Sequence, residues 1–125
     1  MDRKIVDVNE LHVEDVPIVG GKGANLGELT NAGFPVPEAF VLTTESYDYF
    51  VTSGKLMPKI EKKLDSIDRS SDDSLAQASA EIREIFEKCA IPEDLKKEIS
   101  SRYRLLVPKG KVGFVAVRSS ATAED

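Results

Sequence analysis

A glycine-rich hexapeptide near the start of the chain has the composition of an anion-binding turn. Residues 20–25 read Gly-Gly-Lys-Gly-Ala-Asn, and the leucines at positions 26 and 29 then fit one face of a short helix. Glycines let the backbone approach a ligand closely, and the N–H groups at a helix N-terminus attract anions. Lys22 adds a mobile positive charge that can follow a phosphate. A tight turn that leads into a helix without any ligand is the other interpretation.

The glycine spacing excludes the two familiar nucleotide-binding loops. The chain contains no Gly-x-x-x-x-Gly-Lys-Ser/Thr sequence, which is the form of a Walker A loop. Gly21, Gly23 and Gly27 are spaced by two and then four residues, which differs from the Gly-x-Gly-x-x-Gly of dinucleotide-binding proteins. Any phosphate site here must therefore have another form.

A second polar segment follows an apolar run near the other end of the chain. Residues 112–117 (Val-Gly-Phe-Val-Ala-Val) have the length and composition of a strand that is covered on both faces, and Arg118 ends that run. An arginine at the end of a buried strand is costly unless it meets an anion or an acidic partner. Its planar guanidinium suits a phosphate, to which the hydroxyls of Ser119, Ser120 and Thr122 could also donate.

This second segment also has an interpretation without a ligand, in which Arg118 pairs with Glu124 or Asp125 and the serines cap a helix. Considered together, however, Lys22 and Arg118 describe a donor-rich pocket with one cation from each end of an acidic chain of net charge −5. A polyphosphate needs such a pocket, although composition does not distinguish ATP from other phosphate ligands. We therefore expect Lys22 and Arg118 to lie at the opening of one binding site. Their placement on opposite sides of the molecule would exclude a nucleotide site.

Composition narrows the class of protein. The 125 residues, 41% hydrophobic and 31% charged, suit one ordered domain or part of one. The net negative charge argues against a nucleic-acid partner, which usually meets a basic surface. The chain shows no secretory signal and no apolar run long enough for a membrane span, and a single cysteine fits a cytoplasmic protein.

The lone histidine and the lone cysteine are both expected to be structural. His12 stands among acidic residues without a second histidine or a nearby cysteine, so it cannot build a zinc site, and we expect it at the surface. Cys89 falls on the apolar side of an expected helix and is expected to be a small buried hydrophobe. No metal site is predicted within the chain.

Hydrophobic patterning predicts an α/β fold that is rich in helices and has a small sheet. Strands are expected around Ile5, Phe40 and Val115. The helix after Lys22 should end near Gly33 and pack on this sheet. Further helices are expected over residues 45–53, from about Pro58, from the end of a polar linker at 68–74, and from Pro92. Either Thr43 or Thr44 could cap the helix that follows it.

Three ordered blocks of sequence resemble the pyruvate-phosphate dikinase and phosphoenolpyruvate synthase family. The first is 19–29 (Val-Gly-Gly-Lys-Gly-Ala-Asn-Leu-Gly-Glu-Leu), and the second is 33–44 (Gly-Phe-Pro-Val-Pro-Glu-Ala-Phe-Val-Leu-Thr-Thr). The third, at 115–125, contains Ala-Val-Arg-Ser-Ser-Ala-Thr-Ala-Glu-Asp. Because the blocks reach both ends of the chain in the right order, the resemblance covers essentially all of it. The helical stretch at 55–108 is its least specific part.

The resemblance implies a fold and a site. Residues 1–125 would be the truncated N-terminal portion of an ATP-grasp domain. Lys22 and Arg118 would contact the phosphates of ATP, with Ser119 and Thr122 as supporting donors. The third block looks closer to phosphoenolpyruvate synthase than to the phosphate-dependent dikinase. A rifampicin phosphotransferase has a similar start, so that alternative stays open.

The resemblance also implies which parts of the reaction lie elsewhere. A full-length phosphoenolpyruvate synthase would convert ATP, pyruvate and water to AMP, phosphoenolpyruvate and phosphate through a phosphohistidine on a separate domain, which His12 does not match. The Mg²⁺ ligands would likewise lie beyond Asp125, so the chain needs the missing domains of the same polypeptide and is expected to be inactive alone. A stand-alone binding or regulatory module that docks on a full-length partner is an alternative of a different class.

Overall fold

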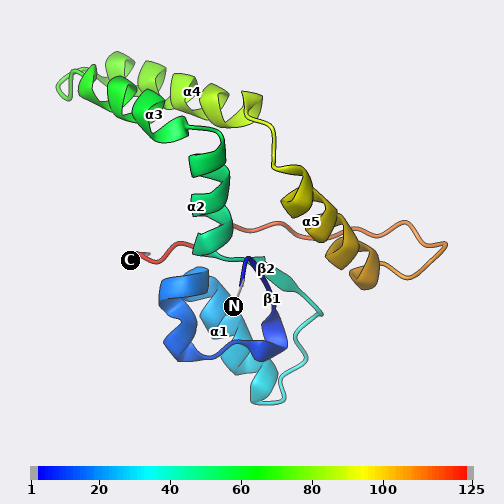
Figure 1. Ribbon diagram of the computed structural model, residues 1–125. Helices are drawn as coiled ribbons and strands as arrows, with labels where there is room; N and C mark the ends of the chain where they lie inside the picture. Colours follow the sequence, from blue (N-terminus) through cyan, green and yellow to red (C-terminus); the bar gives the residue numbers. More distant parts are fainter. Residues whose placement is uncertain (1–2, 124–125) are drawn as a thin grey trace. The chain divides into compact units, whose positions relative to one another are not determined.

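The chain, described over residues 3–123 by a computed structural model, forms two units (Figure 1). The first unit joins the residues up to Tyr47 to those from Glu93 onward, and the second is Asp48–Pro92. The first contains β1 (Ile5–Asp7), the 3-10 helices η1 (Val8–Glu10) and η2 (Val13–Asp15), α1 (Val16–Asn31), β2 (Phe40–Leu42) and α5 (Glu93–Leu106). The helix α2 (Thr44–Ser53) leads from it into the second, which contains α3 (Leu56–Asp65) and α4 (Asp72–Lys88).

The sheet consists of β1 and β2, which pair antiparallel with Ile5 opposite Leu42 and Asp7 opposite Phe40. The core beneath it consists of Val6, Val8, Leu11, Val19 and Ala24, all buried. These apolar residues come from β1, α1 and the short turns between them, so the helix and the sheet share one core. The predicted α/β class, rich in helices and with a small sheet, is confirmed, as are the strands at Ile5 and Phe40.

The predicted third strand around Val115 is wrong for the part of the chain that the structure describes. Residues 112–121 have no regular secondary structure. The side chains of Val112, Phe114 and Val117 are 86%, 95% and 92% exposed. An apolar run is buried only when other elements cover it, and the described residues supply no such cover for this run.

The glycine-rich segment forms a kink inside α1. The backbone at Gly20 has φ 76° and ψ 171°, which separates a short helical piece that starts at Val16 from the longer one that continues to Asn31. The sequence predicted a helix after the glycines but missed the helical turn before them. Gly33, with φ 85°, follows the helix as predicted, and the Phe34 N–H donates to the Leu29 carbonyl in the manner of a helix C-cap.

The start of α2 is tied to the segment before β1. The Thr43 hydroxyl accepts a hydrogen bond from the Ser46 N–H (3.4 Å), so the cap is Thr43 of the two threonines considered. The Thr43 N–H donates to the Lys4 carbonyl (3.0 Å), and its hydroxyl donates to the Arg3 carbonyl (2.8 Å). Thr43 and Ser46 are both buried, and the Ser46 hydroxyl donates to the Lys4 carbonyl, so both hydroxyls are hydrogen-bonded.

The helix α5 begins after Pro92, as predicted, and joins the same unit. Leu95 is buried, whereas Tyr103 on the same helix is 39% exposed. The Tyr103 hydroxyl donates to the Gly113 carbonyl (3.0 Å), which explains its position near the surface. The Arg102 guanidinium lies 2.6 Å from the carboxylate of Asp7, at the end of β1.

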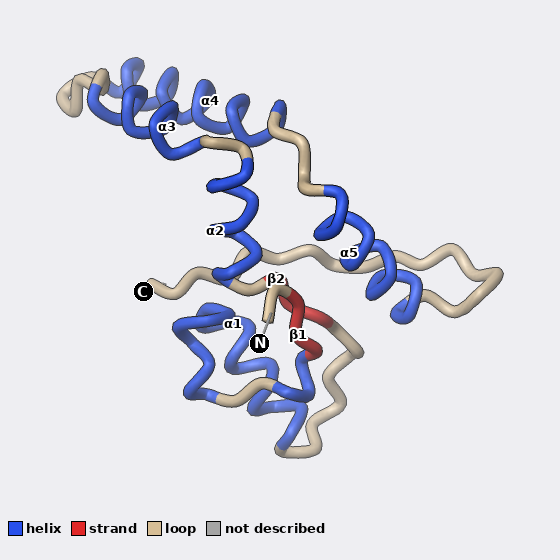
Figure 2. The backbone as a smooth tube through the Cα atoms, viewed as in Figure 1, coloured by secondary structure: helices blue, strands red, loops and turns tan. Residues whose placement is uncertain are grey.

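The second unit is a helical hairpin of α3 and α4, which run side by side (Figure 2). Ser71 caps α4, because its hydroxyl accepts from the Ser74 N–H (3.2 Å). The rings of Phe50 and Phe86 stack with centroids 6.1 Å apart. Cys89 packs partly buried against this cluster, which supports its interpretation as a small apolar residue.

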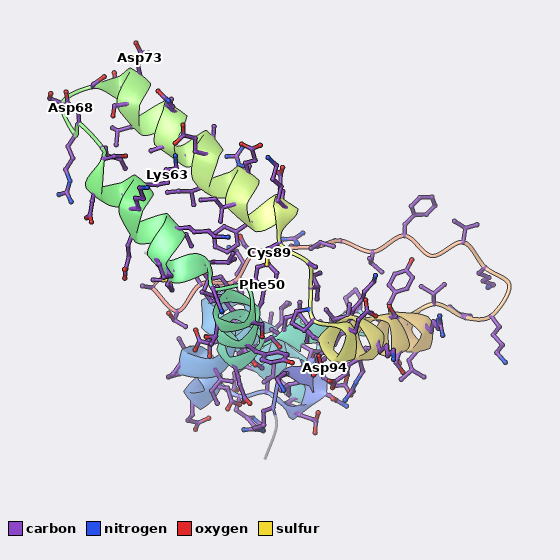
Figure 3. The ribbon with its side chains drawn as sticks, turned by 45° about the horizontal axis from the view of Figure 1, so that its top comes forward. Phe50, Lys63, Asp68, Asp73, Cys89 and Asp94 are labelled. Atoms are coloured by element: carbon purple, nitrogen blue, oxygen red, sulfur yellow. The ribbon has the colours of Figure 1, made fainter. Side chains whose placement is uncertain are left out.

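An ion pair links the two helices of the hairpin and gives it a pH dependence. Lys63, labelled in Figure 3, lies on α3, and its ammonium is 2.7 Å from the Glu81 carboxylate on α4. The hydrogen bond from Lys63 lowers the pKa of Glu81, and a further bond from Gln77 adds to this. A lowered folded-state pKa means that the stabilisation is present above the pKa of an unfolded glutamate. It is lost as the pH falls through the folded-state value.

We therefore expect Glu81→Gln to make the unfolding midpoint of the chain less sensitive to acidification below the pKa of an ordinary glutamate. Thermal unfolding followed by circular dichroism between neutral and acidic pH measures this. Glu87→Gln makes the same change at an exposed position of the same helix and should leave the slope as in wild type. Identical pH slopes for wild type and Glu81→Gln would contradict the prediction.

Candidate functional site

The two polar segments that the sequence singled out are in contact. The Gly21 N–H donates to the Ala121 carbonyl (3.1 Å), and the Gly23 N–H donates to the Ser120 hydroxyl oxygen (3.1 Å). That hydroxyl donates in turn to the Val19 carbonyl (2.7 Å). We call these three hydrogen bonds the clasp. They join residues about a hundred positions apart and attach Ser120 and Ala121 to the kink of α1.

The kink of α1 has glycine at the point of closest approach. A Cβ built on Gly20 would lie 2.4 Å from the Ser120 hydroxyl oxygen and 2.8 Å from the Ala121 carbonyl oxygen. Its φ of +76° is also a conformation that side chains other than glycine rarely adopt. Only glycine combines this backbone conformation with the absence of a Cβ. Gly20 therefore allows Ser120 and Ala121 to approach the backbone of α1 closely.

The expectation that the N–H groups of the glycine-rich segment attract an anion needs correction. The N–H groups of Gly21 and Gly23 are already bonded to Ala121 and Ser120. Ser120 acts as a helix cap supplied from a distant part of the chain, as in the interpretation in which the serines cap a helix. An anion at this place must therefore be held mainly by side chains.

The four predicted binding side chains all reach the surface. Lys22 lies between the two bonded glycines, and Arg118 lies two residues before Ser120. Both are exposed, as are Ser119 and Thr122. The clasp thus places the backbone segments that carry Lys22 and Arg118 against each other. That their charged groups face one common binding site remains a prediction. The alternative pairing of Arg118 with residues 124 and 125 falls outside the described part of the chain.

Ser120 is the residue of this site whose role the sequence did not predict. It was one of three hydroxyls considered, but only Ser119 and Thr122 were retained as binding donors. No local pattern distinguishes Ser120 from Ser119, because its partners lie 97 and 101 positions away along the chain. A contact of that separation leaves no periodic signal in one sequence.

The donor set fits phosphate groups better than a metal ion. Two cations and two hydroxyls on adjoining segments can bind anionic oxygens from several directions. Within residues 3–123, no group of three or more histidine, cysteine, aspartate and glutamate side chains is placed to hold a metal ion. The side chains of Lys22, Arg118, Ser119 and Thr122 are thus chemically suited to anionic oxygen atoms.

His12 lies at the surface, as the sequence predicted. Its side chain is 56% exposed, and its Nδ1 is 3.6 Å from the carboxylate of Glu28 on α1. The same carboxylate accepts from the Val13 N–H (2.8 Å), and Asp15 accepts from the His12 N–H (2.9 Å). These contacts fix η2 against α1, and His12 takes part in them as a structural residue.

Among the described helices, none is long and apolar enough to cross a membrane.

Comparison with known proteins identifies the family to which the chain belongs. Residues 16–125 match the family described as pyruvate phosphate dikinase, AMP/ATP-binding domain. The match includes both the kink of α1 and the segment that carries Arg118. The chain belongs to this family, and the resemblance seen in its three sequence blocks is confirmed.

Individual relatives narrow the comparison. The chain is 45% identical, over its whole length, to a probable phosphoenolpyruvate synthase of Methanothermobacter thermautotrophicus, of which it covers 19%. It is 47% identical over 94% of its length to a probable phosphoenolpyruvate synthase of Methanocaldococcus jannaschii, covering 10% of it. A phosphoenolpyruvate synthase of Pyrococcus furiosus is 37% identical over 93% of the chain, which covers 18% of that protein. The chain thus spans a small fraction of these relatives.

Proposed function

We propose that this chain is the N-terminal portion of the ATP-binding domain of a phosphoenolpyruvate synthase, with an ATP-grasp fold in its complete form. The complete protein converts ATP, pyruvate and water to AMP, phosphoenolpyruvate and phosphate through a phosphohistidine outside this chain. The observation that carries the proposal is the clasp, which joins the two family blocks that bear Lys22 and Arg118.

Each side chain of the site has a role in this proposal. Lys22 binds the phosphates as a mobile point charge, and Arg118 binds them through its planar fork. Both cations stabilise the negative charge that moves during phosphoryl transfer, which is the main task of a protein in this chemistry. Ser119 and Thr122 donate supporting hydrogen bonds. Magnesium, held by residues outside this chain, would supply further charge neutralisation.

The exposed apolar run at 112–117 supports the idea of an incomplete domain. The relatives are many times longer than this chain, so further elements are available to cover Val112, Phe114 and Val117 in a complete protein. We propose that the run becomes a strand of the ATP-grasp sheet there. The 125-residue chain alone would then bind ATP weakly and form no phosphoenolpyruvate.

The proposal is tested by titrating the complete protein with ATP and Mg²⁺. Lys22→Ala and Arg118→Ala should each weaken ATP binding about tenfold, which is typical for the loss of a charge-assisted hydrogen bond. Lys109→Ala and Arg104→Ala remove the same charges at exposed positions of the same unit and should leave the affinity unchanged. Equal affinities for wild type, Lys22→Ala and Arg118→Ala would reject the phosphate site.

The acceptor is decided by a separate measurement on the same complete protein. Phosphoenolpyruvate formation from ATP and pyruvate without added phosphate supports the synthase. An absolute requirement for phosphate would indicate the phosphate-dependent dikinase, and phosphorylation of rifampicin would indicate the antibiotic phosphotransferase. ATP binding without any transfer would favour a regulatory module. The proposed setting is the cytoplasm, with no nucleic-acid partner.

A further inference from the structure

The Ser120 hydroxyl bridges the two helical pieces on either side of the kink in α1. It donates to the carbonyl of Val19, one residue before Gly20, and accepts from the N–H of Gly23, three residues after it. A kink leaves a carbonyl and an N–H without their usual partners in the helix. Ser120 satisfies the Val19 carbonyl and the Gly23 N–H. A single hydroxyl therefore joins both helical pieces of α1 to the segment that carries Arg118.

The clasp attaches the segment that carries Arg118 to α1. Residues 112–121 have no regular secondary structure, and Arg118 and Ser119 are exposed. The hydrogen bonds at Ser120 and Ala121 attach this segment to α1 only two or three residues beyond Arg118. On the α1 side, the bonded Gly21 and Gly23 flank Lys22 directly. The clasp therefore links the backbone that carries Lys22 to the backbone that carries Arg118.

We propose that Ser120 is a positioning residue for ATP binding, which sets the spacing of Lys22 and Arg118 without touching the nucleotide. The inference rests on the proposed function and adds a residue to it. Its hydroxyl is engaged on both sides by backbone groups of α1, as donor and as acceptor, so it acts through the two cations. Ser119 next to it is exposed and belongs to the proposed binding donors.

The test is a double-mutant cycle in the complete protein, with the dissociation constant of MgATP as the readout. Ser120→Ala should weaken binding roughly fivefold, the effect of losing ordinary hydrogen bonds. Ser120→Thr keeps the hydroxyl and should bind within about twofold of wild type. In an Arg118→Ala background, Ser120→Ala should have little further effect, because there is no longer an arginine to position.

Controls separate positioning from a general loss of structure. Ser101→Ala makes the same change at an exposed position of α5 and should alter neither affinity nor the unfolding midpoint. Wild-type affinity of Ser120→Ala beside a tenfold loss in Arg118→Ala would overturn the inference and leave the phosphate site standing. Full additivity of the two losses, or a Ser120→Thr as weak as Ser120→Ala, would also overturn it. An Arg118→Ala that binds like wild type would instead reject the phosphate site itself.

Discussion

Replacement of Gly20 by alanine is expected to weaken MgATP binding by the complete protein about a hundredfold, as much as the loss of both cationic contacts together. The new Cβ would lie 2.4 Å from the Ser120 hydroxyl oxygen and 2.8 Å from the Ala121 carbonyl oxygen, so both must move away. The backbone at φ 76° must also relax, which reorients the helical piece that carries Lys22. Both halves of the site are displaced at once.

Gly33→Ala is the matched control for this prediction. Gly33 also has a positive φ, of 85°, but nothing lies within 4 Å of the Cβ that alanine would add. This variant carries the backbone strain without the steric conflict, so its unfolding midpoint should fall while its ATP affinity stays as in wild type. Titration calorimetry and thermal unfolding of both variants measure the two effects. Wild-type affinity in Gly20→Ala would show that the clasp has no part in binding.

Features with local causes were predictable from the sequence. The helix end at Gly33, a threonine cap at position 43 or 44 and the helix that starts after Pro92 each depend on residues within a few positions of one another. The phosphate-binding role of the two polar blocks stays a prediction, which was made because lysine and arginine beside glycines and serines suit a phosphate. The family match then confirmed the resemblance in which these blocks were placed.

Features with distant causes were not predictable. The hydrogen bond between Ser120 and Gly23 joins residues 97 positions apart, and nothing in either segment indicates that the helix donors are occupied. The run at 112–117 was interpreted as buried because it is apolar, but burial depends on neighbours that the described chain does not supply. The composition of a segment indicates whether its burial would be favourable. The elements around it decide whether it is buried.

Replacement of Leu11 by alanine is expected to lower the free energy of unfolding by about 2–5 kcal/mol, the range for a buried leucine whose cavity does not collapse. Leu11 is 1% exposed and belongs to the core cluster with Val8, Val19 and Ala24. Its carbonyl also accepts from the Asn31 side-chain amide (2.9 Å). Since a domain is usually stable by only about 5–15 kcal/mol, this one change removes a large share of the stability.

Leu29→Ala is the control, because Leu29 lies on α1 but is 43% exposed, so its loss should cost about 1 kcal/mol or less. Urea unfolding followed by circular dichroism gives both values, and equal losses for the two leucines would refute the role of Leu11 as the centre of this core.

Gly27→Ala tests the contact between Leu11 and α1 from the helix side. Its Cβ would lie 2.3 Å from the carbonyl oxygen of Leu11, which remains after the leucine is truncated. The destabilisations by Leu11→Ala and Gly27→Ala should therefore add to each other, because removing the side chain does not relieve a conflict with the backbone.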